Sequence, residues 1–182
     1  MKLGNAAGLD AIDLQILAAL QDHCRMPLVK LGEQVGLSGP SVIERVKKLE
    51  DSGIIRGYHA IVDARRMGKD ITAFIGVSIS HPKRISNFEQ VVALFNDVLE
   101  CHHVTGEHTL LLKVKTANTS SLERLISQIR SLDGVTRTET MIVLSTHTER
   151  VQLALHPAEP APAQPGKRAR RNGERHAHAG RA

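Results

Sequence analysis

The chain has 182 residues, enough for one domain of ordinary size or two small ones, and a formal net charge of +5. Hydrophobic residues make up 41% of it but aromatic residues only 2%, so any core must be built from aliphatic side chains. The N-terminus lacks the apolar segment of a signal peptide and no run of about 18 apolar residues occurs, so we expect no membrane contact. Two cysteines, Cys24 and Cys101, are too few for a disulfide framework, and we expect a cytoplasmic protein with buried or inert thiols.

The first third of the sequence has the apolar spacing of short helices. Apolar residues between Leu9 and Leu20 recur every three or four positions and predict one face of a first helix. A second, shorter helix is predicted over residues 28–35, with Gly36 at its end. We expect residues 1–8, which precede this pattern, to form a flexible N-terminus.

The third predicted helix begins directly after a tight turn. Ser38 is a candidate N-cap, Pro40 falls in the first turn, and the helical pattern runs to about Asp51. Residues 54–62 are β-prone with a central glycine and predict a short wing or linking strand. Three short helices followed by a wing describe a winged helix-turn-helix, a DNA-binding domain that we place at residues 9–58.

The periodicity of the third helix indicates which side chains face away from the core. Ile43, Val46 and Glu50 cluster on one side, and the opposite side presents polar residues that can contact phosphates or base edges. With the residues that begin the helix, the candidate DNA-binding residues are Ser38, Pro40, Ser41, Glu44, Arg45 and Lys48. The alternative is an ordinary solvated helix face with ion pairs between successive turns; the preceding helix, the turn and the wing favour DNA binding over it.

Residues 71–149, which follow a linker at residues 59–70, alternate between predicted strands and helices. The predicted elements are a strand at 71–80, a helix at 85–95, a hairpin at 98–105 and 109–116, a helix at 122–129 and a strand at 135–148. This β-α-β-β-α-β order predicts an α+β, ferredoxin-like domain with both helices on one face of an antiparallel sheet. The other face carries Phe74 and needs a cover, for which a partner subunit is the simplest candidate.

The stretch ECHHVTGEHTL (residues 100–110) concentrates side chains of the metal-binding type. As a strand it alternates, with Cys101 and His103 on one face and His102 on the other, which divides the ligands between two faces. His108 lies across a turn and could join one pair. We expect no metal site, no catalytic cluster and no cofactor, because nothing supplies a partnered nucleophile or a cofactor loop.

Three stretches resemble a known family. They read LDAIDLQILAALQDHCR, LGEQVGLSGPSVIERVKKLEDSGIIRGYHAIVD and ECHHVTGEHTLLLKVK. In order and content they are similar to the leucine-responsive/asparagine-regulator (Lrp/AsnC) family of bacterial transcription regulators, over nearly the whole chain up to about Glu149. The resemblance implies promoter or operator DNA as a partner, an effector domain that dimerises by packing sheets face to face, and assembly of dimers to tetramers or octamers. Gly39 departs from the family's frequent proline, which bears on operator preference and leaves the fold unaffected.

The resemblance also implies a small-molecule pocket between subunits. The family's turn after the second effector-domain strand commonly reads V-[ST]-G-D-[YF]-D, and here it reads VTGEHT. Gly106 would let the backbone approach a ligand, its amide and that of Glu107 would bind a carboxylate, and the Glu107 side chain would bind an ammonium group. His108 replaces the usual aromatic residue and Thr109 the usual acid, so this turn loses a negative charge and gains a titratable ring. The expected effector is an amino acid or a related metabolite. The opposing wall, on family analogy, is Thr138, Thr140, Met141 and Ile142.

Other functions stay open from the sequence alone. A polar turn without any ligand would make the chain an effector-independent DNA-binding regulator. Haem-pathway decarboxylases have a similar two-part fold and use histidines near a tetrapyrrole, and the histidines that keep this enzyme alternative open are His59, His102, His103 and His108. The basic third helix argues against it. A third alternative is an oligomerisation or metabolite-sensing module that does not bind DNA.

The C-terminal residues 150–182 are rich in proline and alanine and then in basic residues, so we expect a disordered tail. From Pro157 onward six Lys/Arg residues stand against two acids, which gives this tail a charge of +4 and leaves +1 for the residues before it. The KRARR run could add phosphate contacts to DNA, or it could be a solubilising extension with no partner.

Overall fold

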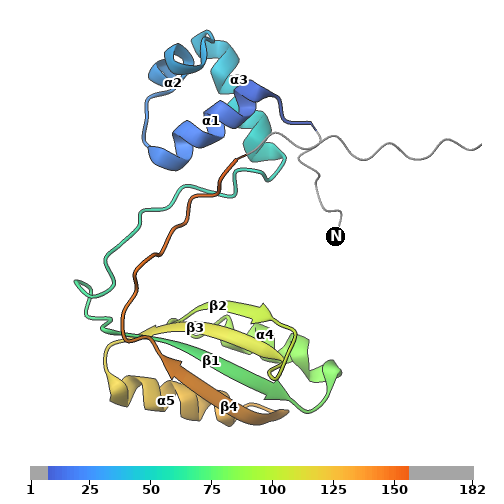
Figure 1. Cartoon of the computed structure of the whole chain (residues 1–182). Coiled ribbons are helices and arrows are strands. Elements are labelled where there is room, and N and C mark those ends of the chain that lie inside the picture. Colours follow the sequence, from blue (N-terminus) through green and yellow to red (C-terminus); the bar gives the residue numbers. More distant parts are fainter. Residues whose placement is uncertain (1–7, 156–182) are drawn as a thin grey trace, which may run out of the picture. The chain divides into compact units, whose positions relative to one another are not determined.

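The computed structural model describes residues 8–155, which form two units (Figure 1). The first unit consists of residues 8–57 together with residues 152–155, and the second consists of residues 58–151. The chain therefore passes from the first unit to the second and then returns to the first. Within the described residues no helix is long and apolar enough to cross a membrane.

The first unit is built from three short helices, α1 (Ala11–Asp22), α2 (Leu28–Val35) and α3 (Gly39–Asp51). Helix α1 begins at Ala11 because Asp10 is its N-cap: the Asp13 amide donates to Asp10 Oδ1 at 2.8 Å and the Asp10 amide donates to Asp13 Oδ2 at 3.1 Å. Leu9, which the apolar spacing assigned to this helix, lies just before it and packs against the core.

The turn between α2 and α3 is tight because two glycines permit it. Gly36 ends α2 with a φ of 71°, in the left-handed region that favours glycine. Gly32 faces the Leu37 carbonyl so closely that a Cβ there would lie 2.8 Å from the Leu37 oxygen. Ser38 caps α3 by accepting a hydrogen bond from the Ser41 amide at 3.4 Å, and Pro40 lies in the first turn, as predicted.

The three helices enclose one aliphatic core. Its buried members are Ile16, Leu17, Ala19, Leu20, Leu31, Val35, Val42, Val46 and Leu49. Because α3 contributes Val42, Val46 and Leu49 to this core, one side of α3 is fixed against α1 and α2 and the other faces solvent.

The wing or linking strand predicted over residues 54–62 is not formed. The amides of Ile54 and Ile55 both donate to the Leu49 carbonyl at 3.0 Å, which closes the end of α3. Beyond them the backbone is irregular, and among the described residues no strand pairs with it. A β-prone segment needs a partner edge to become a strand, and none is present here.

The second unit has the predicted β-α-β-β-α-β order, which confirms the α+β fold class. Its elements are β1 (Ile71–Ile79), α4 (Ile85–Val92), β2 (Val98–His103), β3 (Leu110–Thr116), α5 (Thr119–Arg130) and β4 (Val135–Ile142), with a 3-10 turn at Pro82–Arg84. The strands form an antiparallel sheet in the order β2-β3-β1-β4. Both helices lie on one face of this sheet (Figure 1).

The last strand is shorter than predicted because its partner ends. Ile142 pairs with Ala73, and the Val143 amide still donates to the Thr72 carbonyl at 2.9 Å. Since β1 begins at Ile71, the edge with which β4 pairs ends within two residues of Ile142, although the β-prone pattern continues to Thr148.

The core of the second unit lies between the sheet and its two helices. The buried strand residues are Ala73, Ile75, Val77, Leu110, Leu112 and Val114, and the helices add Phe88, Val92, Leu122, Leu125 and Ile129. The alternation predicted for β1 is confirmed, because its odd-numbered residues face this core. Its even-numbered residues face the side of the sheet without helices, which we call the open face.

Of the two alternatives predicted for the thiols, buried or inert, burial is excluded, because Cys24 and Cys101 are both exposed. Partial burial and the nearby carboxylate of Glu89 raise the pKa of the Cys101 thiol. A raised pKa lowers the fraction of thiolate at neutral pH, so we expect Cys101 to react slowly.

Candidate functional site

The solvent-facing side of α3 is the candidate nucleic-acid interface, and it differs from the side that periodicity predicted. Ile43, predicted to be on the buried side, is 51% exposed, and Val42 takes its place in the core. The exposed side chains along α3 and its first turn are Ser38, Pro40, Ile43, Glu44, Lys47, Lys48, Glu50 and Asp51. Lys47, which is not among the six candidates from the sequence, therefore belongs with Glu44 and Lys48 on the exposed side.

Arg45 occupies a different position from the other candidate DNA contacts. Its Nη1 donates to Asp10 Oδ2 at 2.6 Å and to Asp13 Oδ1 at 2.8 Å. Asp10 and Asp13 form the capping box of α1, so Arg45 ties the start of α1 to the middle of α3. The Asp13 amide first, and then the Arg45 side chain, lower the pKa of the Asp10 carboxyl, while the two carboxylates raise the pKa of Arg45. Arg45 thus positions α3.

Ser38 and Ser41 form the start of α3. Besides the cap contact, their hydroxyls lie 2.8 Å apart in a hydrogen bond. Both hydroxyls remain at the surface at the N-terminal end of α3, where the helix dipole favours a phosphate. Of the six residues predicted to contact DNA, the structure thus gathers Ser38, Pro40, Ser41, Glu44 and Lys48 along one helix.

The second candidate site is the turn between β2 and β3. Gly106 has a φ of 118°, which only glycine adopts without strain, and Glu107 is exposed. Thr109 is held against β1: its amide donates to the Val77 carbonyl at 2.9 Å and its Oγ1 accepts from the Ile79 amide at 3.1 Å. The turn is therefore fixed at its Thr109 end and presents Glu107 to solvent.

Four charged or titratable side chains meet beside this turn. Arg137 on β4 forms an ion pair with Glu107 and another with Glu139, the latter at 3.1 Å. The Nε2 atom of His108 lies 3.4 Å from Glu139 Oε2, and the Nδ1 atom lies 3.5 Å from the Ser78 hydroxyl. The His108 ring lies over Gly76, where a Cβ would come within 2.3 Å of it. Acidic and basic groups alternate around one position, which suits a ligand that carries both charges.

Only part of the predicted opposing wall lies on the same side as this turn. Residues paired across a sheet point to the same face, and Thr138, Thr140 and Ile142 pair with the core-facing residues of β1. They therefore face the helices. Met141 pairs with Phe74 and does lie on the open face, together with Arg137 and Glu139, which the sequence argument missed. The alternation within TRTETMI indicates which residues share a face of the sheet. Which of the two sets lies on the open face depends on the register with β1, which the sequence alone does not show.

The alternation of the histidines in β2 is confirmed. Cys101 and His103 pair with the core-facing residues of β3, whereas His102 pairs with Leu111 on the open face. His102 is held there by Glu100, with 3.1 Å between Nε2 and Oε2. That contact and the ammonium of Lys113 lower the pKa of Glu100.

One group of possible metal ligands, Glu107, His108 and Glu139, was not foreseen from the sequence. Their ligand atoms lie within 4.8 Å of one another. The guanidinium of Arg137 already pairs with the carboxylates of Glu107 and Glu139, so a metal ion would have to displace this guanidinium. The donor set therefore fits this ion-pair network at least as well as it fits a metal ion.

Relatives with known structures or curated roles share both units. The AsnC-type helix-turn-helix model matches residues 9–50, and the Lrp/AsnC ligand binding domain model matches residues 72–153. The transcriptional regulator FL11 of Pyrococcus horikoshii is 34% identical over 147 residues, which is 81% of this chain and 97% of the relative. The leucine-responsive regulatory protein of Rhizobium meliloti is 35% identical over 150 residues, 81% of this chain and 96% of the relative.

Solved structures of transcription regulators superpose on this chain over both units. A transcriptional regulator of Neisseria meningitidis in complex with L-Met superposes with a TM-score of 0.76 at 31% identity, over 80% of this chain and 96% of that one. AsnC of E. coli superposes with a TM-score of 0.74 at 30% identity, over 79% and 97% of the two chains. These relatives are transcription regulators, so the decarboxylase alternative falls away. The chain belongs to the Lrp/AsnC family of DNA-binding transcription regulators and carries that family's helix-turn-helix and ligand-binding domains.

Proposed function

We propose that this regulator reads operator DNA with the exposed side of α3 and that a small amino acid or related metabolite modulates its binding. The observation that carries the first part is the position of α3: its core side is fixed by Val42, Val46 and Leu49, which leaves the opposite side free to enter a major groove. The second part rests on the charged groups that meet beside the Gly106 turn.

The DNA contacts divide by side chain. Lys47 and Lys48 bind phosphates or guanine edges, and Glu44 accepts from cytosine. The hydroxyls of Ser38 and Ser41, at the N-terminal end of α3, bind a phosphate, and Pro40 packs against the backbone of the duplex. Arg45 contributes indirectly, by holding α3 against the cap of α1.

A footprint on the region upstream of the protein's own gene tests this assignment. Lys47→Ala with Lys48→Ala is expected to abolish protection without changing the melting temperature, because both side chains are exposed. The matched control is Arg124→Ala with Arg130→Ala, which removes the same charge from the exposed side of α5. Protection that survives in the lysine variant, or is lost equally in the control, refutes the assignment.

For the effector, the turn and β4 together offer groups for both ends of an amino acid. The amides of Gly106 and Glu107 and the guanidinium of Arg137 suit a carboxylate, and the carboxylates of Glu107 and Glu139 suit an ammonium group. Because Arg137 already pairs with both acids, a zwitterion would exchange these internal ion pairs for its own. A structural relative from Neisseria meningitidis binds L-Met, which supports an amino acid as the class.

Thermal shift against the twenty amino acids identifies the effector. A ligand at 100 times its dissociation constant adds about 2.7 kcal/mol to the unfolding free energy, which is readily detected. Glu107→Gln, which keeps the shape of the side chain but removes its charge, is expected to weaken the hit at least tenfold. Glu123→Gln, on the exposed side of α5, is the control. Unchanged binding by Glu107→Gln refutes the ammonium contact.

We also propose that the protein works as a homodimer, assembling to a tetramer or octamer, in the cytoplasm. The open face of the sheet carries Phe74, Leu111 and Met141, and Met141 is 47% exposed in the single chain. A second copy packed on this face would bury these side chains, which favours association. Light scattering coupled to size exclusion measures the assembly, and Met141→Lys is expected to reduce it.

A further inference from the structure

Ile43 is a large apolar side chain on the solvent-facing side of α3, where it is 51% exposed. Val42, the residue before it, is fully buried and supplies the contact with the core at this level of the helix. The neighbours of Ile43 on the exposed side are charged, because Glu44 follows it directly and Lys47 lies one helical turn further on. Helix α3 therefore presents an apolar side chain to solvent between charged ones.

A single exposed apolar side chain is common on protein surfaces and does not by itself indicate a function. At position 43, however, isoleucine gives the helix little in return. It is β-branched, so it loses side-chain freedom in a helix and forms helices less well than alanine, leucine, glutamate or lysine. Neither core packing nor helix propensity accounts for an isoleucine at this position.

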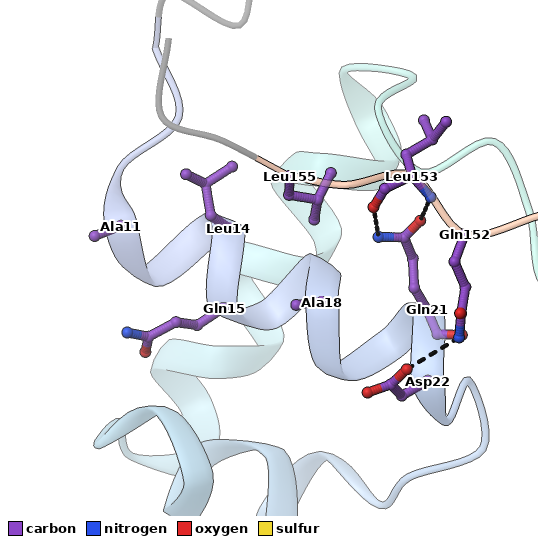
Figure 2. A pocket seen from close by; sticks show the side chains of 9 residues that line it. All are labelled: Ala11, Leu14, Gln15, Ala18, Gln21, Asp22, Gln152, Leu153 and Leu155. Carbon is purple, nitrogen blue, oxygen red and sulfur yellow. Dashed lines mark hydrogen bonds between the residues drawn. The ribbon is translucent and has the colours of Figure 1, made fainter.

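On α1, apolar surface of the same unit is covered by a later segment of the chain. Figure 2 shows residues 152–155 lying along α1, where the Gln21 side chain donates to the Leu153 carbonyl at 3.1 Å and accepts from the Leu153 amide at 2.7 Å. Leu155 is half-buried and packs against the core of the three helices. The groove at this place is lined by residues of α1 and of this segment, so the cover does not extend to Ile43 on α3.

Ile43 lies in a row of residues along the exposed side of α3. Residues three, four and seven positions apart share one side of a helix, which places Pro40, Ile43 and Lys47 in line. At 1.5 Å per residue this row is roughly 10 Å long, and a major groove is about 12 Å wide. Among the base edges that face the major groove, thymine offers an apolar group, its C5-methyl.

We propose that Ile43 is a specificity-determining residue that contacts the C5-methyl group of a thymine in the operator. This role rests on the proposed function, in which α3 reads operator DNA. Discrimination against other bases follows from the same contact. Guanine, adenine and cytosine present hydrogen-bonding groups at the major-groove edge, and an isoleucine packed against such a group leaves it without a partner.

The size of the effect follows from the group that is buried. Burial of one methyl group changes an equilibrium constant by about fourfold. Replacing the thymine by a different base also leaves polar groups unpaired, and a mismatched base pair typically weakens binding by about fivefold or more. Loss of the methyl group alone is therefore expected to have the smaller effect of the two, at a defined position in each half-site.

Fluorescence anisotropy with the full-length chain tests the contact, on the duplex that the footprint defines. Each thymine is replaced in turn by deoxyuridine, which lacks the C5-methyl group and keeps the pairing with adenine. For wild type, the replacement is expected to weaken binding about fourfold at the thymine that Ile43 contacts. In Ile43→Ala the same replacement is expected to have no effect, because the side chain that contacts the methyl group is gone.

Two further variants separate this contact from general effects. Ile43→Val keeps a branched apolar side chain and is expected to retain sensitivity to the same thymine. Val29→Ala removes another exposed, β-branched side chain of this unit, 66% exposed on α2, and is expected to keep the wild-type pattern at every thymine. Ile43→Ala is expected to fold like wild type, because the side chain lies outside the core and alanine is a better helix former.

The outcomes distinguish this role of Ile43 from the reading of DNA by α3. If Ile43→Ala remains as sensitive as wild type to every deoxyuridine, or if wild type is sensitive to none, Ile43 contacts no thymine methyl group and the proposal is overturned. If the variant Lys47→Ala with Lys48→Ala binds the duplex as tightly as wild type, α3 does not read the operator, and the proposed function itself fails.

Discussion

The turn between α2 and α3 has no room for a side chain at Gly32, and replacing this residue tests the packing that orients α3. A Cβ at position 32 would lie 2.8 Å from the Leu37 carbonyl oxygen, whereas ordinary contacts lie at 3.4–4 Å. The obstacle is backbone, so the turn itself must move. Gly39 offers a matched control, because a Cβ at this first residue of α3 meets no atom within 4 Å.

The two substitutions are expected to change stability in opposite directions. Alanine has a helix propensity about 0.8–1.0 kcal/mol better than glycine. At Gly32 this gain is opposed by about 1–3 kcal/mol of overpacking, and by weakening of the 2.8 Å hydrogen bond from the Leu37 amide to the Gly32 carbonyl, worth about 0.5–1.5 kcal/mol. Gly32→Ala is therefore expected to lower the unfolding free energy of the three helices by about 1–3 kcal/mol, and Gly39→Ala to raise it by up to about 1 kcal/mol.

Urea unfolding followed by circular dichroism measures both values on the full chain. Both units contain helices, so if they unfold independently the unfolding curve is fitted as two transitions, one for each unit. Operator binding at a temperature where the variant is folded reports whether α3 has moved. If Gly32→Ala proves as stable as wild type or more so, the close approach to Leu37 does not exist in solution and the reasoning fails.

Three further outcomes are expected. Arg45→Ala lowers the melting temperature of the three helices at neutral pH. The pKa of Asp10 is lower in the folded state than its ordinary 3.8, so the ion pair stabilises the fold fully above pH 3.8, and this stabilisation is lost as the pH falls through the folded-state pKa. A difference in melting temperature between wild type and Arg45→Ala that persists in strong acid contradicts this role of the ion pair. Leu125→Ala, at a side chain only 4% exposed, costs the second unit about 2–5 kcal/mol in chemical denaturation. Cys101 reacts with a maleimide more slowly than an unstructured peptide cysteine, and Glu89→Gln speeds the reaction; equal rates with and without Glu89 contradict the assigned cause.

Features determined by local chemistry were predictable from the sequence. The start of α3 needed only a capping serine and a proline in the first turn, and the end of α2 needed only Gly36. The alternation of β1 and the spacing of apolar residues in α5 gave the fold class for the same reason. Each of these signals lies within a few residues of the element that it defines.

Features determined by distant partners were not predictable. Among the described residues the β-prone segment at 54–62 has no partner edge, and β4 ends near the residue that faces the start of β1 at Ile71. Residues 152–155 were assigned to the tail because nothing in their sequence indicates that Gln21, more than 130 positions earlier, provides matching donors and acceptors.

The exposed side of α3 was misplaced for a specific reason. Ile43 is large and apolar, so periodicity assigns it to the core, yet it is 51% exposed. Arg45 is charged, so periodicity assigns it to solvent, yet it is half-buried by two carboxylates more than 30 residues away. The two misplaced residues shift the predicted DNA-facing side around the axis of α3 in the same direction. The shifted side leaves out Lys47, which is exposed. The family resemblance indicates which helix would read DNA, but which of its side chains are exposed follows from the packing.

Residues 76 and 108 show how a departure from the family pattern can keep its structure. The family resemblance implies an aromatic residue at the position of His108, and the His108 ring lies so close to Gly76 that a Cβ there would come within 2.3 Å of it. A glycine within a strand usually weakens a sheet, but here the absence of a Cβ at Gly76 leaves space for the His108 ring. Histidine is also a planar ring and occupies this space, and its two nitrogens contact Ser78 and Glu139, which a phenyl ring cannot do. The substitution thus keeps a planar ring beside Gly76 and adds two polar contacts, and we propose that His108 acts on ligand selection.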